Sequence, residues 1–332
     1  MDYRQAGVDI KKENASISTM VSALQKTFAE RKGKLGEVID LGDYFANLID
    51  IGNGKALAMS TDGAGSKVII AELLDDYTTV GIDMVAMNVN DIICTGAEPI
   101  ALVDYYAVEE INERRSLEIA QGVARGSIEA GVAVIGGETA SLPDTIKGAK
   151  PKTGFDIAGT AIGIVDKDKI IDGKKVKPGD AILGLASSGI HSNGLTLARK
   201  VLDLSDKKTL RELLTPTRIY VKPILKLLKS CEVHGLAHIT GGGLNKIRRL
   251  NKNYGVDIPS PRKPQKIFQE IQKKAGISEA EMYRTFNMGT GFAVVLPESE
   301  VASAKKLLSA LDPMVIGSVI REKAIYLRGE KA

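Results

Sequence analysis

The chain has 332 residues, of which 44% are hydrophobic and 26% charged, a composition typical of folded proteins that excludes a disordered chain. The net charge of +4, without an arginine-rich block interleaved with aromatics, excludes an obvious nucleic-acid partner. Two cysteines, a polar N-terminus and no apolar run near ~20 residues predict no disulfide framework, signal peptide or membrane span, and so a cytoplasmic protein.

Helices and strands alternate along the first half. Residues 16–33 predict one amphipathic helix within a polar N-terminal arm. The segments after it predict strands at 55–63, 100–109, 133–140 and 155–165, and helices at 80–96 and 113–131. Residues 166–180 are charged and rich in Gly and Pro, which predicts a domain boundary near residue 170.

The second half alternates in the same way. Its segments predict strands at 181–189, 289–297 and 323–329, and helices at 193–202, 217–230, 244–250 and 298–311. This pattern predicts an α/β (α+β) protein with two domains, 1–170 and 171–332. The order of strands in each sheet is left open.

The segment STDGAGSK, residues 60–67, predicts a turn between a strand and a helix. Glycines let a backbone approach a ligand closely, an aspartate can hold Mg²⁺, and a lysine can bind phosphate. The chain contains neither G-x-x-x-x-G-K-[ST] nor G-x-G-x-x-G, so the two commonest nucleotide signatures are absent. Taken alone, the segment fits an ordinary turn as well as a phosphate site.

The helix predicted at 80–96 carries carboxylates among apolar residues. Asp83 and Asn90 are seven residues apart and therefore share a face, and Asp91 follows directly. Buried carboxylates need a partner, and with Asp62 and Glu138 at two strand ends the set favours Mg²⁺ and its oxygen ligands. The alternative is that Asp83 and Asp91 cap loops or pair with Arg and Lys.

Two polar loops stand out in the second half. SSGIHSNG, residues 187–194, places serines, His191 and Asn193 before a helix, where an anion can bind. AHITGGG, residues 237–243, places glycines and His238 before another helix. A helix cap and two structural histidines are the alternative interpretation.

These motifs together resemble phosphoribosylformylglycinamidine cyclo-ligases, also called aminoimidazole ribonucleotide synthetases. The matching motifs run in the family's order and are YRQAGVDI, STDGAGSK, GIDMVAMNVNDIICTGAEP, DYYA, IGGETA, FDIAGTAIG, SSGIHSNG, LLTPTRIYVKPIL, VHGLAHITGGG and EMYRTFNMGTGFAV. After the triple glycine this chain has LNKIRRL, where the family usually has an ENLPR-like segment. The loop after Glu138 and the segment 250–275 also depart from the family pattern.

The resemblance implies a homodimer whose N-terminal domains form a β-barrel at the interface, with a C-terminal sheet flanked by helices. It implies ATP and Mg²⁺ as cofactors. The reaction would be the ring closure of formylglycinamidine ribonucleotide to 5-aminoimidazole ribonucleotide, with ADP and phosphate, in purine biosynthesis. ATP would phosphorylate the formyl oxygen, and the ring-closing nitrogen would then expel phosphate.

Site residues follow from matching the family's chemistry to the motifs. The residues expected at the nucleotide are Ser60, Thr61, Asp62, Gly63, Gly65, Lys67 and Asn90. Those expected at Mg²⁺ are Asp62, Asp91, Glu138 and, with less support, Asp83. Those expected at the substrate are Ser187, Ser188, Gly189, His191, Ser192, Asn193, Thr240, Gly241 and Gly242. Lys67 and either His191 or His238 are expected to be catalytic, and the choice between the histidines is open.

Three relatives and one different class of protein are the rival interpretations. Formylglycinamidine ribonucleotide synthetase shares the chemistry of ATP activation, and thiamine-phosphate kinase fits MYRTFNMG less well. Selenophosphate synthetase needs a reactive Cys near the N-terminus, which this chain lacks. A non-catalytic nucleotide-binding module would not need all four carboxylates.

Overall fold

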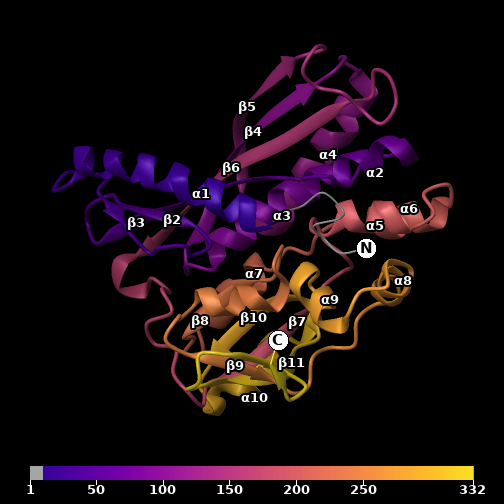
Figure 1. Cartoon of the computed structure of the whole chain (residues 1–332). Coiled ribbons are helices and arrows are strands. Elements are labelled where there is room, and N and C mark those ends of the chain that lie inside the picture. The colour runs from indigo at the N-terminus through magenta and orange to yellow at the C-terminus, as the bar shows by residue number, and fades with distance from the viewer. Residues whose placement is uncertain (1–9, 332) are drawn as a thin grey trace.

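Two sheets, one in each half of the chain, organise the fold (Figure 1). The structure, a computed structural model, describes residues 10–331. The motif YRQAGVDI at residues 3–10 lies outside the described residues except for Ile10. No helix among the described residues has the length and apolar character needed to cross a membrane.

The N-terminal sheet has six strands in the order β1-β2-β3-β6-β4-β5. Only β4 and β5 run parallel, joined by the crossover helix α4, and the other neighbours are antiparallel. The elements of this half are α1 (Ile10–Leu24), η1 (Gln25–Arg31), β1 (Val38–Ile39), β2 (Asn47–Asp50), β3 (Lys55–Gly63), α2 (Lys67–Leu74), α3 (Val80–Ile93), β4 (Glu98–Val108), α4 (Glu113–Ala130), β5 (Ala133–Ser141) and β6 (Phe155–Asp166).

Helix α3 lies at the centre of the molecule. It packs on β3, β4 and β6 of its own sheet and also contacts α7 and β8 of the second half. Glycines let α4 approach it closely, because a Cβ on Gly81 would lie 2.4 Å from the backbone nitrogen of Val123. The polar side chains of this almost wholly buried helix therefore have to find partners inside the protein.

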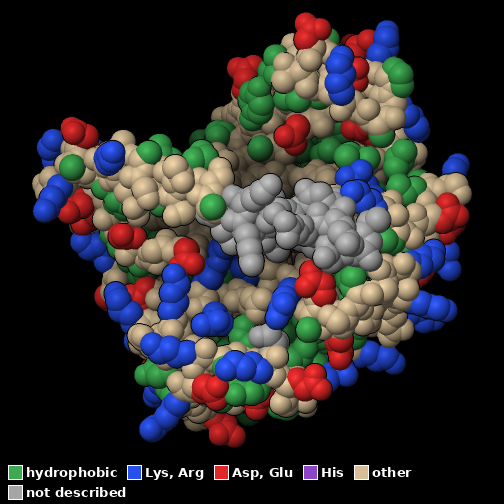
Figure 2. Space-filling view, in the orientation of Figure 1, with side chains coloured by type: hydrophobic (Ala, Val, Ile, Leu, Met, Phe, Trp, Pro, Cys, Tyr) green, Lys and Arg blue, Asp and Glu red, His purple; other side chains and the backbone are tan. Residues whose placement is uncertain are grey.

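The C-terminal sheet has seven strands in the order β13-β12-β9-β11-β7-β10-β8. The elements of this half are η2 (Lys167–Lys169), β7 (Ala181–Ala186), α5 (Leu195–Val201), α6 (Lys207–Leu213), α7 (Val221–Leu228), β8 (Gly235–His238), η3 (Gly243–Arg249), β9 (Gly255–Ile258), α8 (Lys266–Ala275), α9 (Glu279–Thr285), β10 (Thr290–Leu296), η4 (Glu298–Glu300), α10 (Val301–Leu307), η5 (Ser309–Leu311), β11 (Met314–Ile320), β12 (Ile325–Leu327) and β13 (Glu330–Lys331). The buried apolar residues of both halves form one connected core. On the face in Figure 2, Lys and Arg side chains are spread over the lower, C-terminal half.

The mixed α/β class is confirmed, and several element boundaries differ from the prediction. The helix expected at 217–230 begins only at Val221, since the backbone N–H groups of Thr217 and Tyr220 bind side chains of α3. The basic segment 244–250 is a 3-10 helix rather than an α-helix, and it follows two glycines with positive φ. The N-terminal sheet is open within the described part of one chain, and the barrel expected across a dimer interface stays a prediction.

Candidate active site

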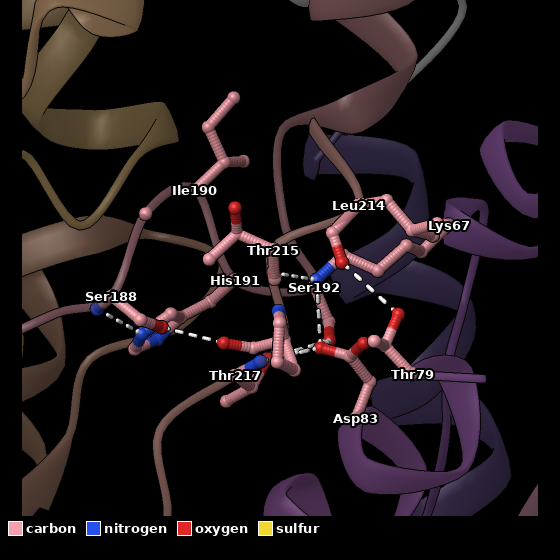
Figure 3. Close-up of polar contacts among 12 residues, drawn as sticks. Lys67, Thr79, Asp83, Ser188, Ile190, His191, Ser192, Leu214, Thr215 and Thr217 are labelled. Atoms are coloured by element: carbon pink, nitrogen blue, oxygen red, sulfur yellow. Dashed lines mark hydrogen bonds and ion pairs between the residues drawn. The ribbon is translucent and has the colours of Figure 1, made fainter. Parts of the chain in front are cut away.

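A buried ion pair of the N-terminal half lies where the two halves meet, and loops of the second half bind it (Figure 3). Lys67 and Asp83 are both fully buried, and Lys67 Nζ lies 2.7 Å from Asp83 Oδ1. Lys67 Nζ also donates to the carbonyl of Thr215 at 2.6 Å. Asp83 Oδ1 accepts from the backbone N–H of Thr217 at 2.8 Å and from the hydroxyls of Thr217 at 2.6 Å and Ser192 at 3.2 Å. Phosphate and Mg²⁺ were the expected partners of Lys67 and Asp83, and the structure pairs them with each other.

Burial lowers the pKa of Lys67, and the charge of Asp83 opposes that shift. An ammonium group without water is stable only while its carboxylate partner stays in place. The geometry therefore favours a structural role for this pair, which fastens α2 and α3 to the loops of the second half.

Two more side chains of α3 bind the second half. Asn90 Oδ1 accepts from the backbone N–H of Tyr220 at 3.0 Å, and its Nδ2 donates to the carbonyl of Arg218 at 2.9 Å. Asp91 Oδ1 lies 2.8 Å from Nδ1 of His238, which is fully buried at the end of β8. Asp91 itself keeps about a fifth of its side chain exposed, whereas the side chain of His238 has no exposed surface.

Asp62 lies at the end of β3, close enough to Asp91 for the two charges to interact. Asn88 Nδ2 donates to the backbone carbonyl of Asp62 at 3.0 Å, and Asp62 Oδ1 accepts from the N–H of Gly63 at 2.7 Å. Burial raises the pKa of Asp62, the hydrogen bond from Gly63 opposes the shift, and the charge of Asp91 adds to it. A cation between these carboxylates would relieve their repulsion, and their oxygens suit Mg²⁺.

Glu138 lies on the opposite face of the N-terminal sheet. It aligns across the sheet with Tyr105, whereas Asp62 aligns with Asp104 through Gly159. Neighbouring residues of a strand point to opposite faces, and three strand spacings separate β3 from β5 by about 14 Å. Among residues 10–331, no group of three or more His, Cys, Asp or Glu side chains could hold a metal ion. The four predicted carboxylates therefore do not meet within one chain.

The two residues before Asp62 point to different faces of the sheet. Ser60 is buried, whereas Thr61 is exposed and its Oγ1 lies 2.9 Å from Oγ1 of Thr160. Thr61 therefore shares a face with Glu138, away from the Asp62 carboxylate.

Two side chains of the serine-rich loop 187–194, those of Ser188 and His191, form hydrogen bonds that stabilise it. Ser188 Oγ donates to the carbonyl of Pro216 at 2.5 Å, and Ser188 N–H donates to Nε2 of His191 at 3.1 Å. His191 is buried in the left-handed conformation with φ 65°, and no described residue hydrogen-bonds its Nδ1. Burial holds the pKa of His191 well below its ordinary value, so the ring is neutral at neutral pH.

Two amide side chains outside the predicted set donate hydrogen bonds to backbone carbonyls of this loop. Asn287 Nδ2 donates to the carbonyls of Gly189 at 2.9 Å and Ile190 at 3.0 Å. Gln265 Nε2 donates to the carbonyl of Ser187 at 3.0 Å. The MYRTFNMG motif contained Asn287 and could have indicated it, whereas Gln265 lies in a segment without a motif.

Glycines bring three loops together at this seam. Gly65 has φ 61°, and a Cβ there would lie 3.7 Å from the carbonyl oxygen of Ser192. A Cβ on Gly241 would lie 2.8 Å from Asn193 Oδ1, so the loop 240–243 comes within contact distance of the Asn193 side chain in the serine-rich loop. The predicted nucleotide loop and both predicted substrate loops thus meet beside α3.

Comparison with known proteins identifies the family. Models described as "AIR synthase related protein, N-terminal domain" and "AIR synthase related protein, C-terminal domain" match residues 44–165 and 177–330. A relative from Pyrococcus furiosus named phosphoribosylformylglycinamidine cyclo-ligase is 53% identical over 317 residues, which cover 93% of this chain and 92% of the relative. This chain belongs to the phosphoribosylformylglycinamidine cyclo-ligase family. A relative of the same name from Methanocaldococcus jannaschii is 50% identical over 96% of this chain and 92% of its own. The resemblance drawn from the motifs is confirmed.

Solved structures with low sequence identity share the fold of this family member. AaThiL complexed with AMPPCP and TMP has a TM-score of 0.67 at 16% identity, with 98% of this chain and 96% of that chain covered. T. maritima PurL complexed with ADP has a TM-score of 0.58 at 19% identity, with 88% of this chain and 45% of that chain covered. Both of these proteins were solved as complexes with a nucleotide or its analogue.

Proposed function

We propose that this chain converts formylglycinamidine ribonucleotide and ATP into 5-aminoimidazole ribonucleotide, ADP and phosphate. The observation that carries the proposal is the convergence of the three motif loops beside the carboxylate pair of Asp62 and Asp91. This convergence occurs in a chain 53% identical to a named cyclo-ligase. The solved structures with bound nucleotides support ATP as the phosphoryl donor.

The reaction has two bond exchanges that balance. The formyl oxygen of the substrate forms a bond to the γ-phosphorus of ATP, and the bond from that phosphorus to the ADP oxygen breaks. The ring-closing nitrogen then forms a bond to the formyl carbon, the carbon–oxygen bond breaks, phosphate leaves and the nitrogen loses a proton. Phosphoryl transfer depends mainly on positioning and charge neutralisation.

Asp62 and Asp91 are the residues proposed to hold Mg²⁺. A bound Mg²⁺ would neutralise charge on the triphosphate. His238, buried and 2.8 Å from Asp91, would orient that carboxylate, as second partners of metal-binding groups commonly do. Glu138 could bind a metal ion only on the other face of the N-terminal sheet, which is the face where a second subunit is proposed to pack.

The loop 187–194 is proposed to bind the substrate. Asn193 Nδ2 has no hydrogen-bond partner among the described residues, although it is buried, so it has a free donor for a ligand oxygen. His191 is proposed to orient the substrate as a neutral ring, because its lowered pKa makes it a weak base. Lys67 and Asp83 are proposed to hold the site together rather than to touch the nucleotide.

A homodimer is proposed through the outer face of the N-terminal sheet. Large apolar side chains on this face are exposed, including Tyr105 at 45% and Ile135 at 69%. An exposed apolar face and an exposed strand edge favour association with another chain. Pairing two such sheets into a barrel would cover the apolar face and the strand edge of each. The halves divided near residue 170 are proposed to act as a nucleotide and dimerisation domain and a substrate domain.

The test is a stoichiometric assay. The protein with ATP, Mg²⁺ and formylglycinamidine ribonucleotide is expected to form one diazotisable aminoimidazole for each ADP. The proposal fails if ADP forms only with thiamine monophosphate, or if no aminoimidazole appears while the substrate stays bound.

A further inference from the structure

The buried state of Lys67 leaves the proposed triphosphate site in need of another cation. Both hydrogen bonds of Lys67 end on protein atoms, at Asp83 and Thr215, and its side chain has no exposed surface. The proposed site also holds two carboxylates, those of Asp62 and Asp91, which lie close enough for their charges to interact. A triphosphate carries several negative charges, and binding it requires positive groups as well as a metal ion.

Among the described residues, Lys246 is a cation whose charge interacts with both Asp62 and Asp91. It lies in η3, three residues after the triple glycine, and its Cε would be 3.7 Å from a Cβ placed on Gly242. It is partly buried and lies close enough to Asp62 and Asp91 for both charges to act on it. The other charged groups that act on it are Arg249 and Asp43.

No described residue forms a hydrogen bond or an ion pair with Lys246. An ammonium group in this position has lost much of its water without gaining a partner among residues 10–331, which is unfavourable. Burial, followed by the charge of Arg249, lowers the pKa of Lys246 to about 8, and the three carboxylates oppose that shift only in part. A bound anion would supply the missing partner.

We propose that Lys246 contacts the phosphoryl oxygens of the bound triphosphate, opposite Asp62 and Asp91. This inference rests on the proposed function, because it takes Mg·ATP as the ligand of that site. Lys246 belongs to the segment LNKIRRL, so this chain would use a residue from a part of the sequence that departs from the usual family pattern.

The experiment compares three variants with the wild type. Lys246→Met removes the charge, Lys246→Arg keeps it, and Arg248→Met removes an exposed charge from the same short helix as a matched control. Binding of AMPPCP with Mg²⁺ is measured by calorimetry, together with the melting temperature and the KM and kcat for ATP. Lys246→Met is expected to weaken analogue binding about 10- to 100-fold, the effect of one charge-assisted hydrogen bond.

The expected pattern separates a phosphate contact from a structural role. Lys246→Arg should recover most of the binding, Arg248→Met should bind as the wild type does, and Lys246→Met should melt no lower than the wild type. Wild-type binding by Lys246→Met would overturn the inference, as would a fall in melting temperature with equal loss of binding in Lys246→Arg. Because analogue binding is read without turnover, a wild type that binds AMPPCP but forms no aminoimidazole would refute the proposed reaction and leave the Lys246 comparison valid.

Discussion

Replacing Lys67 by Met tests whether the buried ion pair is structural. The change leaves the Asp83 carboxylate fully buried with hydroxyl and N–H donors but without a positive partner. Removing one partner of a buried pair costs about 3–5 kcal/mol. An unfolding entropy of ~2.1 cal/mol/K per residue over 332 residues gives about 0.7 kcal/mol/K, so the melting temperature should fall by about 4–7 °C.

The measurement is thermal unfolding followed by circular dichroism, with two further variants. The double variant Lys67→Met, Asp83→Asn removes both charges and should recover at least half of the loss, because a neutral pair avoids the unpaired carboxylate. Lys55→Met breaks an exposed pair with Asp166 and should shift the melting temperature by less than about 1.5 °C, since exposed pairs contribute about 0.2–1 kcal/mol. A structural role of the ion pair is refuted if Lys67→Met melts at the same temperature as Lys55→Met. Weaker ATP binding at an unchanged melting temperature would instead support the phosphate role predicted from the sequence.

Three other substitutions test the rest of the site. Asp62→Asn should lower kcat at least about 100-fold at ordinary Mg²⁺ concentrations. The raised pKa of Asp62 means that the folded wild type binds this proton more tightly than the unfolded chain does, so the wild type loses stability as the pH rises from 3.8 to that pKa. Asp62→Asn should not show this loss, and melting curves of both proteins across that pH interval test it. Asn193→Ala should raise the KM for formylglycinamidine ribonucleotide about 10- to 100-fold with little change for ATP, and the reverse selectivity in steady-state kinetics would contradict the loop assignment. Light scattering of the wild type should give about 71 kDa, twice 35.5 kDa, and Ile135→Lys should give the monomer mass; a monomeric wild type would refute the dimer.

The fold class and many elements were predictable because their signals are local. The strand predicted at 55–63 is β3 in the structure, with the same bounds, and its residues alternate between buried and more exposed positions up to Thr61. The strand β11 was missed, although it lies in the middle of the C-terminal sheet. The residues before Val221 depart from a helix because α3 binds their backbone, and sequence periodicity cannot show such a distant contact.

The residues of the candidate site were predictable from the sequence, but which side chains bind one another was less predictable. The spacing of Asp83 and Asn90 placed them on one face of α3, and both do bind the second half. Which cation would pair with Asp83 depended on how α2 meets α3, and no local pattern carries that information. Glu138 lies near the end of its strand, as Asp62 does, but strand order and pleat put the two side chains on opposite faces of the sheet.

The contacts of helix α3 limit how freely the two parts of the chain can be exchanged with those of a relative. The two family models divide the chain between residues 165 and 177, yet Asp83, Asn90 and Asp91 of α3, which lies in the first part, form hydrogen bonds with the second part. A chimera that joined the first part of this chain to the second part of a relative would have to bring matching partners for α3. For protein engineering, this means that a recombination point between residues 165 and 177 would cut the chain between α3 and the residues that α3 binds.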